Sequence, residues 1–221
     1  MSGSPRAGDD APRPEPSSKA EAILAAAERT FLASGFGAVS MDAIAREAGV
    51  SKATVYAHFS GKEELFGAVV EHVSTRRFGG FSVEALDPRD IEASLTTIAV
   101  RFLDLVLSPE AIAVNRIIIG EVTRFPVLGQ VFWAAGPERT RTQIEAFLRR
   151  ASESGTLAVR DNEARAVAEQ FVSLVRGEIH LRRLLRLETA TDTASLAAAA
   201  ASAVATFLRA FHPPVQPAGR P

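Results

Sequence analysis

The chain of 221 residues contains no cysteine, which excludes disulfides and thiolate metal sites. It also lacks an excess of positive charge, because 25 Lys and Arg stand against 26 Asp and Glu and the net charge is −1. Any binding of nucleic acid must therefore come from a local patch on the surface rather than from the charge of the whole chain.

Catalytic and metal-binding patterns are missing as well. The four histidines, His58, His72, His180 and His212, share no helical ligand spacing with one another or with a suitable pair of carboxylates. There is no cysteine nucleophile, and no glycine-rich loop that would hold a phosphate. We therefore expect neither an enzyme nor a bound cofactor or metal.

Long uninterrupted apolar runs are absent too. The first residues, MSGSPRAGDDAPRPEPSS, contain no apolar core of the kind that a signal peptide needs. The longest apolar run, LAAAAASAVATFL, is interrupted by Ser202 and Thr206. Residues 1–17 and 212–221 are rich in proline and polar residues, so we expect both to be disordered tails. These features predict a cytoplasmic protein without a membrane partner.

What the sequence does contain is helical periodicity over nearly all of residues 18–211. No stretch shows the sustained alternation that is typical of strands in a hairpin. We predict an all-α fold of about nine to ten helices, with a three-helix domain at 18–61 and a larger helical domain at 62–211. One long helix is predicted over 161–187, and the last begins at Asp192 or Thr193 and ends near Phe211.

Two short helices follow one another in the first domain. Ser40 is placed to cap a helix that ends at Gly49, and Ser51 is placed to cap the next helix, Lys52 to Phe59. Two short helices joined through a glycine turn are the pattern of a helix-turn-helix. The domain at 18–61 is therefore predicted to have a helix-turn-helix arrangement.

The third helix of this domain presents two different faces. Val55 and Phe59 fall together on a helical wheel and must face the core, while small side chains occupy the opposite side. A helix in the DNA major groove needs small residues near the base edges and longer hydrogen-bond donors beside the phosphates. The small residues are Ala53, Thr54 and Ala57, and the flanking donors are Lys52, Tyr56 and His58.

Two residues outside this helix add to the pattern. Lys62 is a cation in the first turn of its helix, where it opposes the macrodipole, so its position makes sense if an anion lies nearby. Ser40 can offer its hydroxyl and neighbouring amides to a phosphate. Plainer roles exist, with the serines as helix caps, Tyr56 as a half-buried aromatic and Lys62 as a solvated charge. The predicted DNA-binding residues are Ser40, Ser51, Lys52, Ala53, Thr54, Tyr56, His58 and Lys62.

The run FLASGFGAVSMDAIAREAGVSKATVYAHFSGKEELFGAVV resembles the DNA-binding region of the TetR family of bacterial transcriptional regulators. The resemblance covers about Ala20 to Val73. It implies that Tyr56, His58 and Lys62 contact phosphates and that Lys52 and Thr54 lie in or beside the groove. It also implies repression rather than activation. The matching positions are Gly35-Phe36, Ser40, Ile44-Ala45, Ala48-Gly49-Val50-Ser51, Thr54, Tyr56, Phe59 and Lys62.

The rest of the chain is similar to the ligand-binding half of that family only weakly, through the stretches EVTRFPVLGQVFWAAGPERT and FVSLVRGEIHLRRLL, and this similarity implies no particular ligand.

The last two predicted helices suit a homodimer, since an alanine-rich stripe lets helices approach closely. The alternative is that both stripes pack within one chain. In a dimer the two recognition helices should lie about 34 to 36 Å apart, so the operator should be a near palindrome. The predicted interface residues are Phe171, Leu174, Leu181, Leu185, Leu196, Ala200, Ala203, Val204, Phe207 and Phe211.

A site for a small-molecule effector, whose identity the sequence leaves unknown, is indicated by polar residues on apolar stripes. An unpaired Glu178 or Asn115 would be unfavourable there, so each must find a partner in the core, at the dimer interface or beside a ligand. Phe102, Phe132 and Trp133 can line an apolar cavity or belong to the plain core. We predict these five as ligand-binding residues, whereas Arg116 lies on the polar side of its helix and is not included.

The function that we expect is a ligand-responsive repressor, which binds double-stranded operator DNA as a homodimer and is released by a small molecule. The alternative is a helical ligand-binding or adaptor protein whose helix-turn-helix is structural only. The two differ in a measurable way, because a regulator that makes several phosphate contacts loses DNA affinity steeply as salt increases.

Overall fold

The computed structural model describes residues 18–78, 83–187 and 192–213, and within these ranges it contains α-helices and two short 3-10 turns but no strand. The predicted all-α fold is therefore confirmed. The tail predicted at 1–17, and all but the first two residues of the tail predicted at 212–221, lie outside the described residues.

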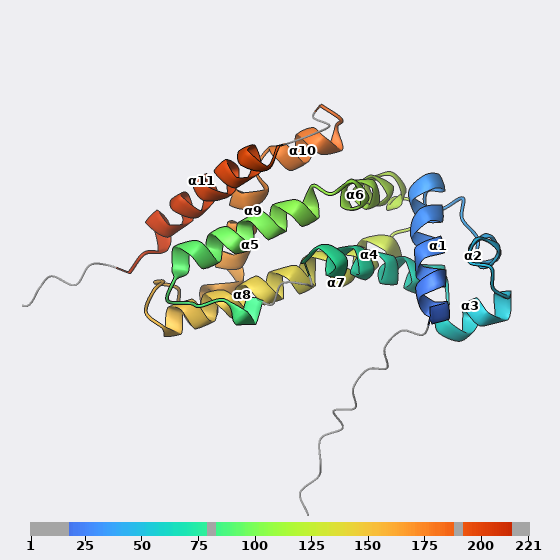
Figure 1. Ribbon diagram of the computed structural model, residues 1–221, viewed down its shortest axis with the longest axis horizontal. Helices are drawn as coiled ribbons and strands as arrows, with labels where there is room; N and C mark the ends of the chain where they lie inside the picture. Colours follow the sequence, from blue (N-terminus) through green and yellow to red (C-terminus); the bar gives the residue numbers. More distant parts are fainter. Residues whose placement is uncertain (1–17, 79–82, 188–191, 214–221) are drawn as a thin grey trace, which may run out of the picture.

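One end of the molecule is formed by three helices, α1 (Ser18–Ser34), α2 (Met41–Glu47) and α3 (Lys52–His58), which lie at the right of Figure 1. The long helix α4 (Lys62–Phe78) leads from them into the larger half. The remaining helices are α5 (Ile91–Val106), α6 (Pro109–Glu121), α7 (Val127–Ala135), α8 (Pro137–Glu153), α9 (Ala164–Arg176), α10 (Ile179–Leu184) and α11 (Thr193–Phe211), with 3-10 turns at Val83–Ala85 and Asp161–Glu163.

A first hydrophobic core joins the N-terminal helices to the larger half. Phe31, Phe36 and Phe66 are fully buried in it, and Phe66 meets each of the other two edge to face, with ring centroids 5.3 and 5.5 Å apart. Val114 of α6 and Leu128 of α7 belong to the same core. The helix-turn-helix end is therefore packed directly against the larger half, so that movements of α6 and α7 can reach it.

A second core is formed by α5, α8, α9 and α11. Phe171 of α9 and Phe207 of α11 are buried there and pack edge to face, with ring centroids 5.0 Å apart. Small side chains such as Ala200 and Ala203 on the inner face of α11 let this helix lie close against the core. The two cores place the cavity described below between the helix-turn-helix end and the α5–α11 end.

The prediction of one continuous helix over 161–187 is wrong. The segment contains a 3-10 turn, then α9, then α10, and Gly177 separates the two helices with φ 51° and ψ −160°. This backbone conformation is readily available to glycine and strained for other residues. The break divides one predicted helix into α9 and α10 within the described residues.

The same break overturns the prediction for Glu178. A helical wheel drawn across Gly177 places Glu178 on an apolar stripe, but the helix ends at Arg176 and the wheel does not continue through Gly177. The carboxylate of Glu178 is 76% exposed and lies 3.4 Å from Arg182 of the next turn. Glu178 therefore lies in solvent, paired with its neighbour, and it does not line the cavity.

Half of the predicted dimer residues are covered by the chain itself. Their side chains form part of the second core, where α5 and α9 pack against α11, so they cannot meet another molecule. Leu196 and Phe211 also pack partly against this core, whereas Leu174, Leu181 and Leu185 are exposed. The helical wheel identified the apolar face of α11 correctly, but it could not show that α5 and α9 of the same chain cover this face. The residues excluded from an interface in this way are Phe171, Ala200, Ala203, Val204 and Phe207.

Helix α11 has a second, outward face that is also apolar. Ala198, Ala201, Ser202 and Ala205 are exposed on it. By length and composition alone α11 is the one helix of the described residues that meets the criteria for crossing a membrane, but its inner face is part of a folded core. This outward face is the part of α11 that remains available for contact with another chain.

Candidate DNA-binding surface and effector cavity

The two helices of the helix-turn-helix begin at serine caps. The hydroxyl oxygen of Ser40 accepts a hydrogen bond from the amide of Ala43 at 3.2 Å, and that of Ser51 accepts one from the amide of Thr54 at 3.1 Å. Gly49 lies between the helices with φ 67°. The plainer role that the sequence suggested for both serines, helix capping, is therefore present in the structure.

Helix α3 buries one side and exposes the other. Val55 is fully buried, and Phe59, which ends the helix, packs partly against the first core. Ala53, Ala57 and the donors beside them are exposed, and Figure 1 shows α3 at the outer end of the molecule. The small side of the helix is therefore accessible to a large partner, as entry into a groove requires.

The donors on this surface differ in their availability. Lys52 pairs with Asp42 at 2.8 Å, a contact that raises the pKa of the lysine, and the hydroxyls of Thr54 and Ser51 lie 2.8 Å apart. Tyr56 is 47% exposed, and His58 is exposed at the end of the helix. Because an exposed ion pair contributes little stability, Lys52 can exchange Asp42 for a phosphate at small cost.

Lys62 does not need an external anion to be satisfied, in contrast to what its position in the first helical turn suggests. Its ammonium donates hydrogen bonds to the carbonyl oxygens of Phe36 and Val39, at 2.9 and 2.8 Å, and lies 4.2 Å from the centre of the Phe36 ring. These contacts satisfy a cation in the first turn of a helix without any external partner. In this structure Lys62 holds the loop between α1 and α2.

A residue that sequence reasoning missed holds the same loop from the other side. The carboxylate of Glu121, at the end of α6, accepts hydrogen bonds from the backbone amides of Phe36 and Gly37 at 2.7 and 2.6 Å. Hydrogen bonds to a charged acceptor are about twice as strong as those between neutral groups. Glu121 therefore fixes the DNA-binding end to α6, and we call this contact the Glu121 latch.

The glycines of this loop are required by the latch. A Cβ at Gly35 would lie 2.5 Å from one carboxylate oxygen of Glu121, and a Cβ at Gly37 would lie 2.8 Å from the other. Gly35 also has φ 76°, a conformation that is strained for other residues. The Gly-Phe-Gly sequence thus lets a carboxylate approach the backbone closely enough to bind two amides.

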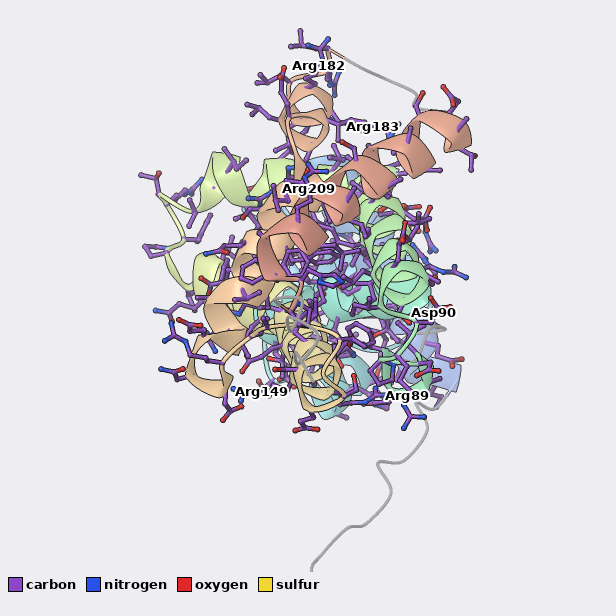
Figure 2. The ribbon with its side chains drawn as sticks, turned by 90° about the vertical axis from the view of Figure 1, so that its left-hand side faces the viewer. Arg89, Asp90, Arg149, Arg182, Arg183 and Arg209 are labelled. Carbon is purple, nitrogen blue, oxygen red and sulfur yellow. The ribbon has the colours of Figure 1, made fainter. Side chains whose placement is uncertain are left out.

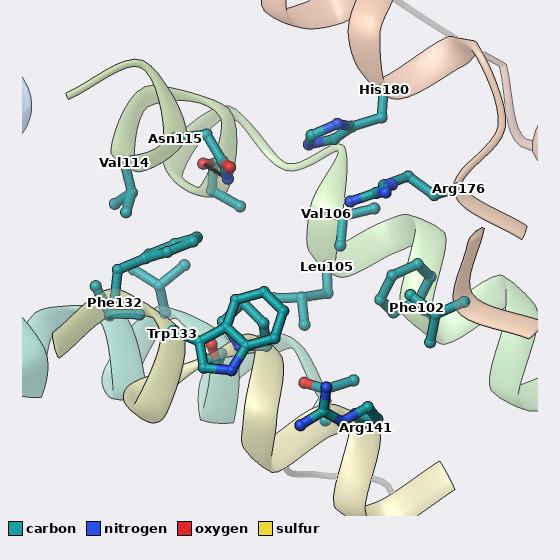
Figure 3. Close-up of a pocket in the computed structure, with 18 of the residues that line it drawn as sticks. Phe102, Leu105, Val106, Val114, Asn115, Phe132, Trp133, Arg141, Arg176 and His180 are labelled. Atoms are coloured by element: carbon teal, nitrogen blue, oxygen red, sulfur yellow. Dashed lines mark hydrogen bonds between the residues drawn. The ribbon is translucent and has the colours of Figure 1, made fainter. Parts of the chain in front are cut away.

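A cavity of about 440 Å³ lies in the larger half and is shown in Figure 3. This volume is within the range typical of small-molecule sites. Four predicted ligand-binding residues line it together, namely Phe102 of α5, Asn115 of α6, and Phe132 and Trp133 of α7. Their contact with a ligand remains a prediction, but the structure brings them to one site.

One wall of the cavity carries a buried arginine that the sequence analysis did not single out. The side chain of Arg141 is 8% exposed and pairs with Glu138 and Glu169. Its Nε is the one buried side-chain N or O atom of the described residues without a hydrogen-bond partner. A signal was available, because Arg141 lies three residues before Ile144 and seven before Leu148 on the apolar stripe of α8.

The opposite wall carries Arg176 and His180. Both line the cavity, and Figure 3 shows them side by side, across the cavity from Trp133. Burial lowers the pKa of His180 below its ordinary value, and the nearby positive charge of Arg176 lowers it further. His180 is therefore uncharged at neutral pH.

Helix α6 connects the cavity, α10 and the latch. Asn115 donates to the carbonyl of Ala111 at 2.8 Å. The next residue, Arg116, is not among the predicted site residues, and it donates to the carbonyls of Leu184 and Arg183 at 3.0 and 2.8 Å. Helix α6 therefore lines the cavity, contacts the end of α10 and, through Glu121, contacts the loop between α1 and α2.

No group of three or more potential metal ligands occurs among the residues that the structure describes.

Residues 23–69 match the family model for bacterial regulatory proteins of the tetR family, and residues 93–213 match the model for the C-terminal domain of AefR-like transcriptional repressors. The chain belongs to the TetR family of bacterial transcriptional regulators. Proteins of this family are DNA-binding regulators and not enzymes.

Two curated regulators are similar to part of the chain. The chain is 35% identical over 97 residues to the regulator SrpR of Pseudomonas putida, a match that spans 44% of this chain and 44% of SrpR. It is 44% identical over 69 residues to the activator FasR of Mycolicibacterium smegmatis, which covers 31% of this chain and 30% of FasR.

Solved structures match over most of the chain. The flavonoid-responsive regulator FrrA is 35% identical with a TM-score of 0.72, and the match covers 89% of this chain and 98% of FrrA. A TetR-family regulator from Mesorhizobium loti is 25% identical with a TM-score of 0.75, and the match covers 90% of this chain and 100% of the Mesorhizobium chain. The arrangement of a small DNA-binding end on a larger helical half is therefore shared with these proteins.

Proposed function

We propose that this protein is a homodimeric repressor that binds a near-palindromic DNA operator and releases it when a small molecule fills the cavity. The observation that carries the proposal is the exposed small side of α3, with Ala53 and Ala57 facing outward between longer donors. Such a surface fits a major groove, because small side chains let the helix approach the base edges. A DNA-binding role also places the protein in the cytoplasm.

Repression is supported by the match of the C-terminal half to AefR-like repressors. FasR, which is 44% identical over 69 residues, is named an activator, so a direct measurement decides the sign of regulation. A promoter-reporter assay reads it directly, since a repressor gives higher expression when its gene is deleted and an activator gives lower expression.

The homodimer is supported by two exposed apolar surfaces near each other. Leu174 at the end of α9 and Leu181 of α10 are 42% and 55% exposed, and the outward face of α11 is rich in alanine. Figure 2 shows α10, marked by Arg182 and Arg183, projecting beside α11. Because contiguous exposed apolar surface marks interaction sites, we assign the interface to these outward faces and not to the buried stripes.

Release by an effector is supported by the contacts of α6. Ala111, Val114 and Asn115 of this helix line the cavity, and Glu121 lies at the latch, six residues beyond Asn115. Six residues of α-helix correspond to about 9 Å. A ligand that shifts α6 therefore moves the loop before α2, and with it the separation of the two recognition helices in a dimer.

The experiment begins with selection of bound fragments from the source genome by the purified protein, followed by fluorescence anisotropy on the selected site. Affinity should fall about a thousandfold or more between 50 and 200 mM salt if six or more phosphates are contacted. Ala53→Glu should weaken binding about a hundredfold or more, because a carboxylate would face the DNA. Ala93→Glu, the same change at an exposed position of α5, should leave the affinity unchanged. Equal affinity of the protein and its Ala53→Glu variant would show that α3 is structural only.

A further inference from the structure

The two arginines of the cavity differ in their electrostatic surroundings. Arg141 pairs with Glu138 and Glu169, and Arg165 lies 3.2 Å from Glu138, so two guanidinium groups balance two carboxylates. Each charged group of this cluster has a partner of opposite charge within the cluster. It offers no net charge to a ligand.

Arg176 has no such partner. Its side chain forms no hydrogen bond and no ion pair with the described residues, although it lines the cavity and Figure 3 shows it directed inward beside His180. The neighbouring His180 is uncharged, since burial and Arg176 itself lower the pKa of His180. The cavity therefore holds one uncompensated positive charge at a defined position.

The rest of the cavity is apolar and partly aromatic. Phe102, Phe132 and Trp133 come from two helices, and valines of α4, α5 and α6 fill the space between them. Aromatic side chains prefer offset-stacked or edge-to-face contact with other rings. Trp133 is 52% exposed, with the guanidinium of Arg141 5.5 Å from the centre of its ring, so part of the indole is open to such a contact.

We propose that the effector of this protein is an aromatic monocarboxylate, whose carboxylate binds Arg176 and whose rings lie against Trp133, Phe102 and Phe132. This inference deepens the proposed function and rests on it for the consequence of binding, but not for binding itself. A planar guanidinium matches a carboxylate with two parallel hydrogen bonds, which gives geometric selectivity for that group.

Other ligand classes fit less well. A cationic ligand would meet the charge of Arg176 and find the carboxylates of Glu138 and Glu169 already occupied. A neutral ligand would leave Arg176 without a partner, as it is now. A ligand with several negative charges would find one uncompensated cation, Arg176, in the cavity, so its other charges would be buried without a partner.

The test uses biphenyl-4-carboxylate and its neutral isostere biphenyl-4-carboxamide as probes, with affinities from isothermal titration calorimetry. Trp133 is the single tryptophan of the chain, so quenching of tryptophan fluorescence locates a bound probe at the cavity. The carboxylate should bind with a dissociation constant below about 1 mM and at least about tenfold more tightly than the carboxamide. Decanoate, an aliphatic carboxylate, should bind more weakly than biphenyl-4-carboxylate.

Variants of Arg176 make the test specific. Arg176→Gln should remove the preference for the carboxylate and leave the affinity for the carboxamide unchanged, whereas Arg176→Lys should keep most of the preference. Arg182→Gln on α10 removes the same charge outside the cavity, so it should bind both probes as the unaltered protein does. Equal binding of the two probes, failure of both to bind, or a preference that survives Arg176→Gln would overturn the proposal. Decanoate binding as tightly as the biphenyl acid would overturn its aromatic part.

Failure of the proposed function has a different signature. Probe binding is measured without DNA, and operator binding is measured without probe. A protein that binds its selected DNA but does not distinguish the two probes remains a regulator with another ligand. A protein that prefers the carboxylate through Arg176 but binds no genomic fragment is a carrier of aromatic acids, and the regulator proposal then fails.

Discussion

The DNA-binding end and the larger half of this protein are both made of helices, but the contacts that shape them differ in range along the chain. At the DNA-binding end the caps bond amides three residues away, as Ser40 does with Ala43. In the larger half the contacts of Arg116 with the carbonyls of α10 span 67 and 68 positions. Local contacts can be recognised in a sequence, whereas distant ones depend on how complete helices pack.

The Glu121 latch is the point where the two regions meet. Its hydrogen bonds join residues 85 and 84 positions apart, and one of them is made to Gly37, in a loop that belongs to the DNA-binding end. The loop therefore has a local signal, its glycines, and a distant partner that no local signal reveals. Four predictions test how independent the two regions are.

The largest effect is expected from the proposed dimer interface. Ala205→Glu places a charge on the outward face of α11 without touching the core, so it should separate the dimer. Operator affinity should then fall about a hundredfold or more, because the second half-site no longer benefits from a tethered partner. Light scattering after size exclusion measures the mass and anisotropy measures the affinity. A monomer of unchanged affinity would show that the two regions act independently, and Ala93→Glu is the matched control.

The next effect concerns the latch. Glu121→Ala removes two hydrogen bonds to a carboxylate and should lower the free energy of unfolding by about 2–3 kcal/mol. For a chain of this length that corresponds to a decrease in Tm of roughly 4–12 °C, measured by calorimetry. Operator release by effector should also be weakened. Gly37→Ala, whose Cβ would displace the same carboxylate, should have a similar effect. A Glu121→Ala variant with unchanged Tm and release would exclude the latch as a connection.

A smaller effect distinguishes the two roles considered for Lys62. Lys62→Met keeps the length of the side chain but removes its bonds to the carbonyls of Phe36 and Val39, so stability should fall by about 1–2 kcal/mol. The dependence of operator affinity on salt should keep its slope. A phosphate contact would instead reduce that slope by about one. A reduced slope with unchanged stability would restore the interpretation from the sequence.

The smallest effect lies inside the cavity. NMR titration should give His180 a pKa below 6.5, and Arg176→Gln should raise this pKa only part of the way, because burial is the larger cause. Since the unfolded chain then binds a proton more readily than the folded one, His180 makes the protein less stable as pH falls through about 6.5. A pKa of His180 that is unchanged in the Arg176→Gln variant would show that the two side chains do not interact.

Most of the DNA-binding surface was predictable from the sequence. The caps, the turn glycine and the buried Val55 follow from spacing, since each depends on residues within one or two helical turns. The same reasoning misjudged Lys62, because the carbonyls that it binds lie 23 and 26 residues away. It also placed Glu178 on a stripe that Gly177 interrupts.

The sequence by itself determined the fold class, the helix-turn-helix and the apolar face of nearly every helix. These depend on backbone propensities and on periodicity, which act over short distances along the chain. Only the tertiary structure decided what covers each apolar face, which of two arginines is left without a counter-ion, and that Glu121 reaches the DNA-binding end. Those outcomes depend on the packing of helices that are far apart in the chain, and no short stretch of sequence contains both partners.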